Sequence, residues 1–131
     1  MDVIQRLKKL DPLQLNDLYM FIGFDGFEDK IQRIVQSGRK EDIRFFGEIK
    51  DFASAVKAAA GKSSQFQLET RYKKLGGNAP IMANAMGHLG IQNTCMGSMG
   101  FPDLRPVFRE LHPTVNPVSV CNPGETNALE F

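Results

Sequence analysis

The apolar residues of this chain switch repeatedly between two spacings, and this alternation limits the folds open to it. A continuous apolar run at 18–24 and an alternating pattern at 65–72 are typical of strands, whereas 42–60 and 79–89 repeat their apolar positions at helical spacing. Further strands are predicted at 94–99, 118–121 and from 128 onward, and further helices at 3–10, 29–36 and 106–111. Strands that alternate with helices predict an α/β fold with a largely parallel sheet.

Two of the predicted strands differ in their surroundings. Residues 18–24 are apolar or aromatic without interruption, so we expect this strand to be buried on both faces. Residues 65–72 place Phe66 and Leu68 on one side and Gln67 and Glu69 on the other, which predicts one covered and one solvated face. This second strand therefore belongs outside the central sheet.

Length and charge narrow the class of protein. A chain of 131 residues fits one domain, residues 1–131, with one hydrophobic core. A net charge of +1 offers no field to attract nucleic acid, and no apolar stretch is long enough to cross a membrane. Only Cys95 and Cys121 are present, in predicted strands, so we expect free thiols and a reducing cytoplasm.

Two acidic residues follow the first predicted strand. Asp25 and Asp29 lie where the carboxyl end of a parallel strand opens toward a ligand site, and carboxylates at that edge can hold sugar hydroxyls. A structural explanation stays open: Asp25 can start a turn, and Asp29 can lie in the first turn of a helix and complement its dipole.

A glycine pair precedes the apolar helix at 79–89. Gly76 and Gly77 allow a ligand to approach the backbone closely, and Asn78 caps a helix whose free N–H groups favour oxygen-rich groups. The same three residues also serve as an ordinary structural cap, and the sequence does not separate the two uses.

Other candidate motifs carry no chemistry. Gly61-Lys62-Ser63 follows a helix instead of opening one, so it predicts a helix end and not a phosphate-binding loop. The glycines at 97 and 100 lack the spacing of a dinucleotide fingerprint. His88 and His112 have no partner at ligand spacing, so the sequence predicts no metal site.

Three segments together resemble the ribokinase-like, or PfkB, carbohydrate kinase family. They are residues 21–31 (FIGFDGFEDKI), 76–90 (GGNAPIMANAMGHLG) and 94–100 (TCMGSMG). The resemblance implies a Rossmann-like three-layer sandwich with a small β lid, whose strands would be about 64–75 and 125–131. The family's catalytic Gly-Ala-Gly-Asp segment is not found in the chain, so we expect an N-terminal portion that is incomplete at its C-terminus.

The resemblance also implies a function. The complete enzyme would use ATP and Mg²⁺ to phosphorylate a hydroxymethyl group of a sugar or nucleoside. In this chain Asp25, Asp29, Gly76, Gly77 and Asn78 would bind that substrate, and no catalytic residue is assigned. Ile81 stands where the ribokinase branch has asparagine, which leaves the sugar open. We expect these 131 residues alone to be inactive as a kinase.

An alternative function belongs to another class. The chain would then be a non-catalytic module that binds a small ligand or forms a homodimer through its lid strands, since an exposed sheet edge can pair with another chain. The apolar end at Phe131, within a predicted strand, favours the kinase portion.

Overall fold

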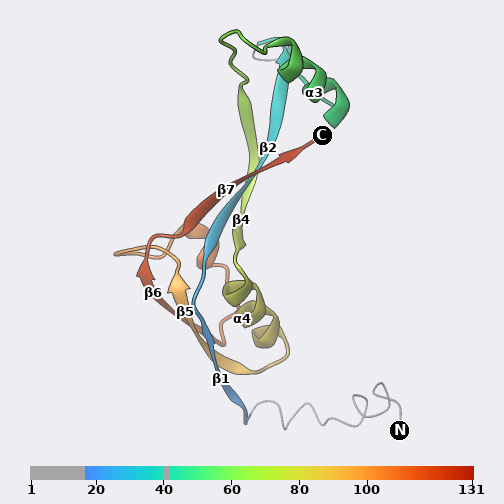
Figure 1. The fold of residues 1–131 in the computed structure, drawn as a ribbon. Coiled ribbons are helices and arrows are strands. Elements are labelled where there is room, and N and C mark those ends of the chain that lie inside the picture. Colours follow the sequence, from blue (N-terminus) through green and yellow to red (C-terminus); the bar gives the residue numbers. More distant parts are fainter. Residues whose placement is uncertain (1–16, 40–41) are drawn as a thin grey trace, which may run out of the picture. The chain divides into compact units, whose positions relative to one another are not determined.

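A computed structural model describes residues 17–39 and 42–131, which form two compact units. Of the described residues, the first unit contains 17–28 together with Leu75–Gly124, and the second contains those of Asp29–Lys74 and Glu125–Phe131 (Figure 1). The helix predicted at 3–10 lies outside the described residues.

The first unit is built on a parallel sheet of three strands. Its strands are β1 (Tyr19–Gly23), β5 (Gln92–Ser98) and β6 (Val115–Cys121), in the order β1-β5-β6. Both neighbouring pairs run parallel, and Ile22 of β1 lies beside Cys95 of β5. The predicted α/β fold with a parallel sheet is therefore confirmed, and the three strands lie close to where the sequence placed them.

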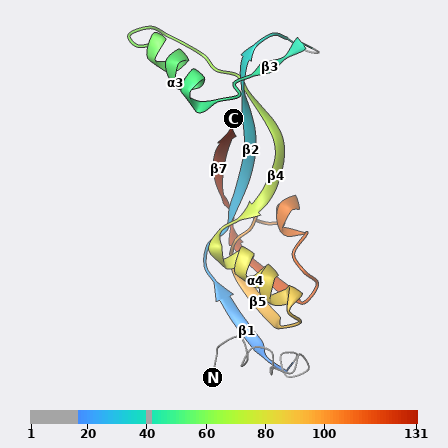
Figure 2. The ribbon, with the colours of Figure 1, turned by 90° about the vertical axis from the view of Figure 1, so that its right-hand side faces the viewer.

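Helix α4 (Asn78–His88) packs on one face of this sheet (Figure 2). The small residues Ala79, Ala83 and Gly87 form its buried side, which allows the helix axis to come close to the strands. The buried core of the unit also contains apolar side chains from the turns that follow β5 and from the start of β6: Met99, Val107, Phe108, Leu111 and Val115. The predicted helix at 79–89 is confirmed.

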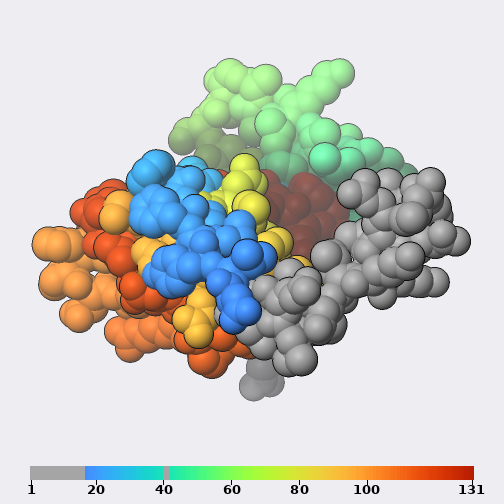
Figure 3. Space-filling view, turned by 90° about the horizontal axis from the view of Figure 1, so that it is seen from below, coloured from blue at the N-terminus to red at the C-terminus, as the bar shows by residue number. Residues whose placement is uncertain are grey.

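The opposite side of β1 is open among the described residues. Ile22 is buried, but Tyr19 is 65% exposed and Phe21 is also exposed, and the atoms of this segment lie at the surface in Figure 3. The expectation that β1 is buried on both faces is wrong. Within the described part of the chain, α4 is the α-helix that packs on this sheet, and it covers one face. A second helical layer stays a prediction.

The second unit contains a four-stranded sheet. Its strands are β2 (Phe27–Ser37), β3 (Arg44–Phe45), β4 (Leu68–Gly76) and β7 (Gly124–Glu130). Their order is β3-β2-β4, and β7 also pairs with β2. The strands predicted near 64–75 and 125–131 are thus observed as β4 and β7, in a sheet separate from the parallel one.

The predicted helix at 29–36 is wrong, because these residues belong to strand β2. Ile31, Ile34 and Val35 have a spacing that fits a helix, but β-branched side chains also favour strands, and β2 has β3, β4 and β7 to pair with. Residues 106–111 are also not an α-helix, since only Pro106–Phe108 form a short 3-10 turn.

Helix α3 (Ile49–Ala58) is shorter than the helix predicted at 42–60. Its Phe52 ring packs against those of Phe46, Phe66 and Phe131, with ring centroids 5.5, 5.2 and 5.7 Å apart. This aromatic cluster holds α3 within the second unit. No helix of the described residues is long and apolar enough to cross a membrane.

Candidate functional site

Asp25 lies at the carboxyl end of the parallel sheet, in the turn between β1 and β2. Its Oδ2 accepts a 2.8 Å hydrogen bond from the backbone N–H of Asn78, and its Oδ1 accepts one of 2.7 Å from that of Ala79. These two donors are unsatisfied groups of the first turn of α4, whose positive dipole end also favours a carboxylate. Asp25 therefore caps α4, although it lies 53 residues before Asn78, the first residue of the helix.

The glycine pair places the start of α4 against this turn. Gly76 is buried and ends β4, and Gly77 is the N-cap residue with φ of +91°, a conformation that other residues rarely adopt. A Cβ at Gly77 would lie 3.0 Å from Cα of Gly26 and 3.2 Å from the Asp25 carboxyl carbon. Asn78 begins the helix with an exposed side chain. The structure thus brings Asp25, Gly77 and Asn78 together.

Two further glycines, Gly26 and Gly97, take part in this packing, although the sequence predicted no role for them. A Cβ at Gly97 would lie 2.2 Å from the carbonyl oxygen of Asp25, and a Cβ at Gly26 would lie 2.0 Å from that of Ser98. The turn after β1 consequently lies directly against the end of β5. The Asp25-Gly26 and Gly97-Ser98 dipeptides, each beside a predicted strand end, are the signals that could have indicated this contact.

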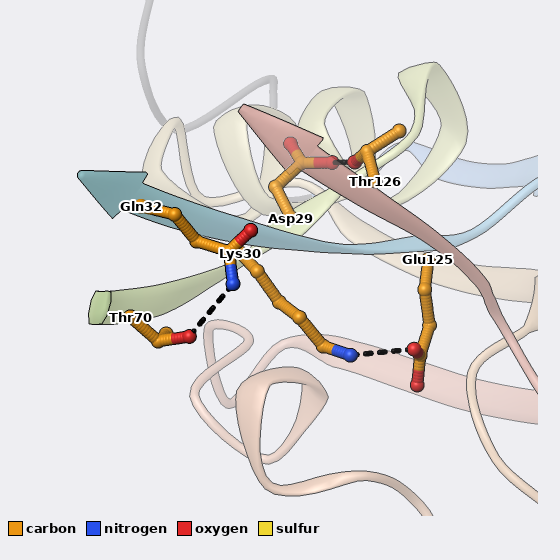
Figure 4. Close-up of polar contacts among 6 residues, drawn as sticks. All are labelled: Asp29, Lys30, Gln32, Thr70, Glu125 and Thr126. Atoms are coloured by element: carbon orange, nitrogen blue, oxygen red, sulfur yellow. Dashed lines mark hydrogen bonds and ion pairs between the residues drawn. The ribbon is translucent and has the colours of Figure 1, made fainter. Parts of the chain in front are cut away.

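Asp29 belongs to the second unit, on strand β2. Its Oδ1 accepts a hydrogen bond from the hydroxyl of Thr126 on β7, and the neighbouring Lys30 forms an ion pair of 2.6 Å with Glu125 on the same strand (Figure 4). These contacts join β2 to β7. The alternative that Asp29 lies in the first turn of a helix is wrong, since no helix begins there.

A third polar contact joins β2 to β4. Gln32 Nε2 donates a 2.9 Å hydrogen bond to Thr70 Oγ1, as Figure 4 shows. The side chain of Gln32 is buried, and its Oε1 has no hydrogen-bond partner among the described residues. Side-chain contacts therefore link β2 to β4 and to β7 in this part of the second unit.

The electrostatics near the Asp25 turn involve one cysteine. Cys95, on β5, is fully buried and free. Burial, and next the negative charge of Asp25, raise the pKa of the Cys95 thiol to about 11. This thiol is therefore uncharged at neutral pH and leaves Asp25 as the negative charge beside it.

Neither a cluster of metal ligands nor a phosphate-binding loop is found among the described residues. They contain no group of three or more potential ligands for a metal ion. Gly61-Lys62-Ser63 follows α3 and does not open a helix, so its backbone does not form the cradle that a phosphate-binding loop provides.

One comparison covers nearly the whole chain. The family model for prokaryotic ketohexokinase matches residues 2–131. Searches of curated proteins and of solved structures found no significant match.

Proposed function

The chain belongs to the prokaryotic ketohexokinase family, and from that premise we propose that it forms the sugar-binding part of a sugar kinase. The substrate would be a ketohexose, and in the complete reaction ATP would transfer a phosphoryl group to its hydroxymethyl group. The chain contains no Gly-Ala-Gly-Asp segment, so we assign it binding and not phosphoryl transfer. In this proposal the protein works in the cytoplasm, with the second helical layer of a ribokinase-like sandwich covering the open side of β1.

The position of Asp25 is the observation that carries this proposal. Two backbone N–H groups hold its carboxylate at the carboxyl end of β1. Each carboxylate oxygen has two acceptor sites, so both oxygens can also accept a hydrogen bond from a sugar hydroxyl. A carboxylate fixed in this way binds hydroxyls with little loss of side-chain entropy, which favours affinity.

The residues beside Asp25 add to the same surface. Gly77 is partly exposed and carries no side chain, so a sugar ring can come close to its backbone, whereas the buried Gly76 would contribute by positioning Gly77. Asn78 has an exposed amide that can donate and accept hydrogen bonds with further hydroxyls. Asp29, on strand β2 of the second unit, is proposed separately: its carboxylate can accept a hydrogen bond from a sugar hydroxyl in addition to the one from Thr126.

Titration with D-fructose, the simplest ketohexose probe, tests this proposal. Calorimetry on the full chain should detect binding to wild type, and Asp25→Asn should weaken it at least about tenfold, because a charged acceptor is lost. Asp17→Asn is the matched control, because Asp17 precedes the amino end of β1 and lies outside the proposed site. Equal affinity of both variants and wild type, or no binding of fructose by wild type, would contradict the proposal.

A second candidate function rests on strand β7. All seven of its residues are exposed, and it pairs with β2 on one side. An exposed strand edge can pair with the same strand of a second copy, so β4 and β7, the predicted lid strands, would form a homodimer interface. Analytical ultracentrifugation tests this function, since a non-catalytic dimerising module would sediment as a dimer, whereas a monomer would contradict it.

A further inference from the structure

Helix α3 of the second unit exposes a row of apolar side chains. Ile49 is 68% exposed and Val56 is 46% exposed, and the exposed Ala53 and Ala60 continue the same row. Successive members are four, three and four residues apart, so they lie on one side of the helix and of the turn that ends it. Every residue of α3 is at least partly exposed. We call these four residues the α3 row.

The contacts of α3 within the second unit leave this row free. The helix has ten residues, and isolated helices shorter than about 12–15 residues are only marginally stable in water. The ring of Phe52 packs against other aromatic rings and holds the neighbouring side of the helix. Ile49 and Val56 therefore present apolar surface that contributes to stability only when a partner covers it.

The α3 row fits a second copy of itself. When two such helices run antiparallel about a two-fold axis, the order of the positions is reversed, and a spacing of four, three and four residues stays the same. Ile49 of one copy then faces Ala60 of the other, and Val56 faces Ala53. Each larger side chain meets a small one, which allows the two helices to pack closely.

The charges at the two ends of α3 fit the same arrangement. Residues 48–51 contain two acids and one lysine and carry a net charge of −1, whereas residues 57–62 contain two lysines and carry +2. An antiparallel pair brings the acidic end of one helix beside the basic end of the other and opposes the two helix dipoles. A parallel pair would bring like charges together, so the charges favour the antiparallel direction.

We propose that the chain associates with a second copy of itself through an antiparallel contact between two α3 rows. Two ten-residue helices bury less than the roughly 1,200 Å² at which stable interfaces begin, so this dimer is weak and dissociates on dilution. The contact uses neither the Asp25 turn nor the edges of β4 and β7. It is therefore independent of the proposed sugar binding and of the second candidate function.

Sedimentation equilibrium of the full chain, from micromolar to millimolar concentration, tests the contact. We expect wild type to change from monomer to dimer over this range. Ala53→Glu should weaken dimerisation at least about tenfold, because it buries a charge in the middle of the contact. Ala58→Glu is the matched control, since Ala58 is exposed on the opposite side of α3, and it should dimerise like wild type.

Cross-linking tests the direction of the two helices. In a Cys121→Ser background, which removes the exposed thiol, Ala53→Cys places the new thiols of the two copies about 4.5 Å apart along the helix axis. Ile49→Cys places them about 16 Å apart in the same antiparallel pair. Mild oxidation should therefore give a disulfide-linked dimer with Ala53→Cys and not with Ile49→Cys, whereas a parallel pair would be linked at both positions.

A second variant keeps the test decisive if Ala53→Glu alters the circular dichroism. Ile49→Ala should also weaken the dimer, and because Ile49 is exposed the folded monomer should be unchanged. The proposal is overturned if wild type remains a monomer at millimolar concentration. It is also overturned if Ala53→Glu and Ile49→Ala dimerise as well as Ala58→Glu, which is the result that a dimer formed through the lid strands would give.

Discussion

Asp25 Oδ1 accepts a 2.7 Å hydrogen bond from the backbone N–H of Ala79, in the first turn of α4. This contact joins the turn after β1 to a helix that begins 53 residues later, so one carboxylate both caps the helix and is held in place by it. The strand end, the cap and the proposed sugar ligand consequently depend on the same side chain. Any change at Asp25 should therefore affect stability as well as binding.

The first prediction concerns this cap. Asp25→Ala should lower the free energy of unfolding by about 1–3 kcal/mol, because two N–H groups lose a charged acceptor and the helix dipole loses a complementary charge. Asp25→Asn should cost less, since its amide oxygen still accepts one hydrogen bond. Urea denaturation followed by circular dichroism measures the difference. A loss no larger than that of the Asp17→Ala control would contradict the capping role.

The second prediction concerns the contact between Gly97 and the Asp25 turn. Gly97→Ala should destabilise the protein by about 1–3 kcal/mol or more, because its Cβ would lie 2.2 Å from a backbone oxygen that cannot move independently. Gly47 is the matched control, since a Cβ there meets nothing within 4 Å. Gly47→Ala should be neutral or slightly stabilising. Thermal denaturation of the two variants compares them, and equal melting temperatures would show that the turn after β1 adapts to the added atom.

The parallel sheet and α4 could be predicted from the sequence because their patterns have one interpretation. Small apolar residues at Ala79 and Ala83 mark the side of α4 that packs on the strands, and Gly90 ends the pattern. The exposure of β1 could not be predicted, because an apolar strand has the same composition whether one or both of its faces are covered in the folded chain.

Strand β2 shows a second limit of predicting secondary structure from sequence. The spacing of Ile31, Ile34 and Val35 fits a helix and a strand equally well, and the choice depends on partners distant in the sequence. The contacts of Asp25 with α4 are of the same kind, since each joins residues more than 50 positions apart. The sequence indicated Asp25 as a candidate, but not the two N–H groups that it caps.

The third prediction follows from the raised pKa of Cys95. The thiol has a pKa of about 11 in the folded protein against 9.0 as its ordinary value, so the unfolded chain loses this proton first as the pH rises. Stability should therefore be unaffected by this group below pH 9 and fall between pH 9 and 11, by roughly 2–3 kcal/mol at most.

Comparison with Cys95→Ala isolates that effect from the tyrosines and lysines that titrate in the same range. The variant is expected to be less stable at pH 7, because it leaves a small cavity beside β1, but its free energy of unfolding should fall less steeply above pH 9. Urea denaturation at pH 7, 9 and 10 measures both slopes. Parallel slopes for the two proteins would show that burial of Cys95 does not disfavour its thiolate.

The last prediction concerns how α3 is held in the second unit. Phe52 contacts three other aromatic rings, whereas Ile49 on the same helix is 68% exposed. Phe52→Ala should therefore destabilise the second unit by about 2–4 kcal/mol, since it removes one ring from each of the three pairs, while Ile49→Ala should change stability by less than about 0.5 kcal/mol. Amide hydrogen exchange measures this directly: the amides of α3 should lose protection in Phe52→Ala, and those of α4 should keep it because α4 packs on the separate parallel sheet. Equal protection of α3 in the two variants would mean that backbone pairing of β2, β3 and β4, and not the aromatic cluster, holds the helix.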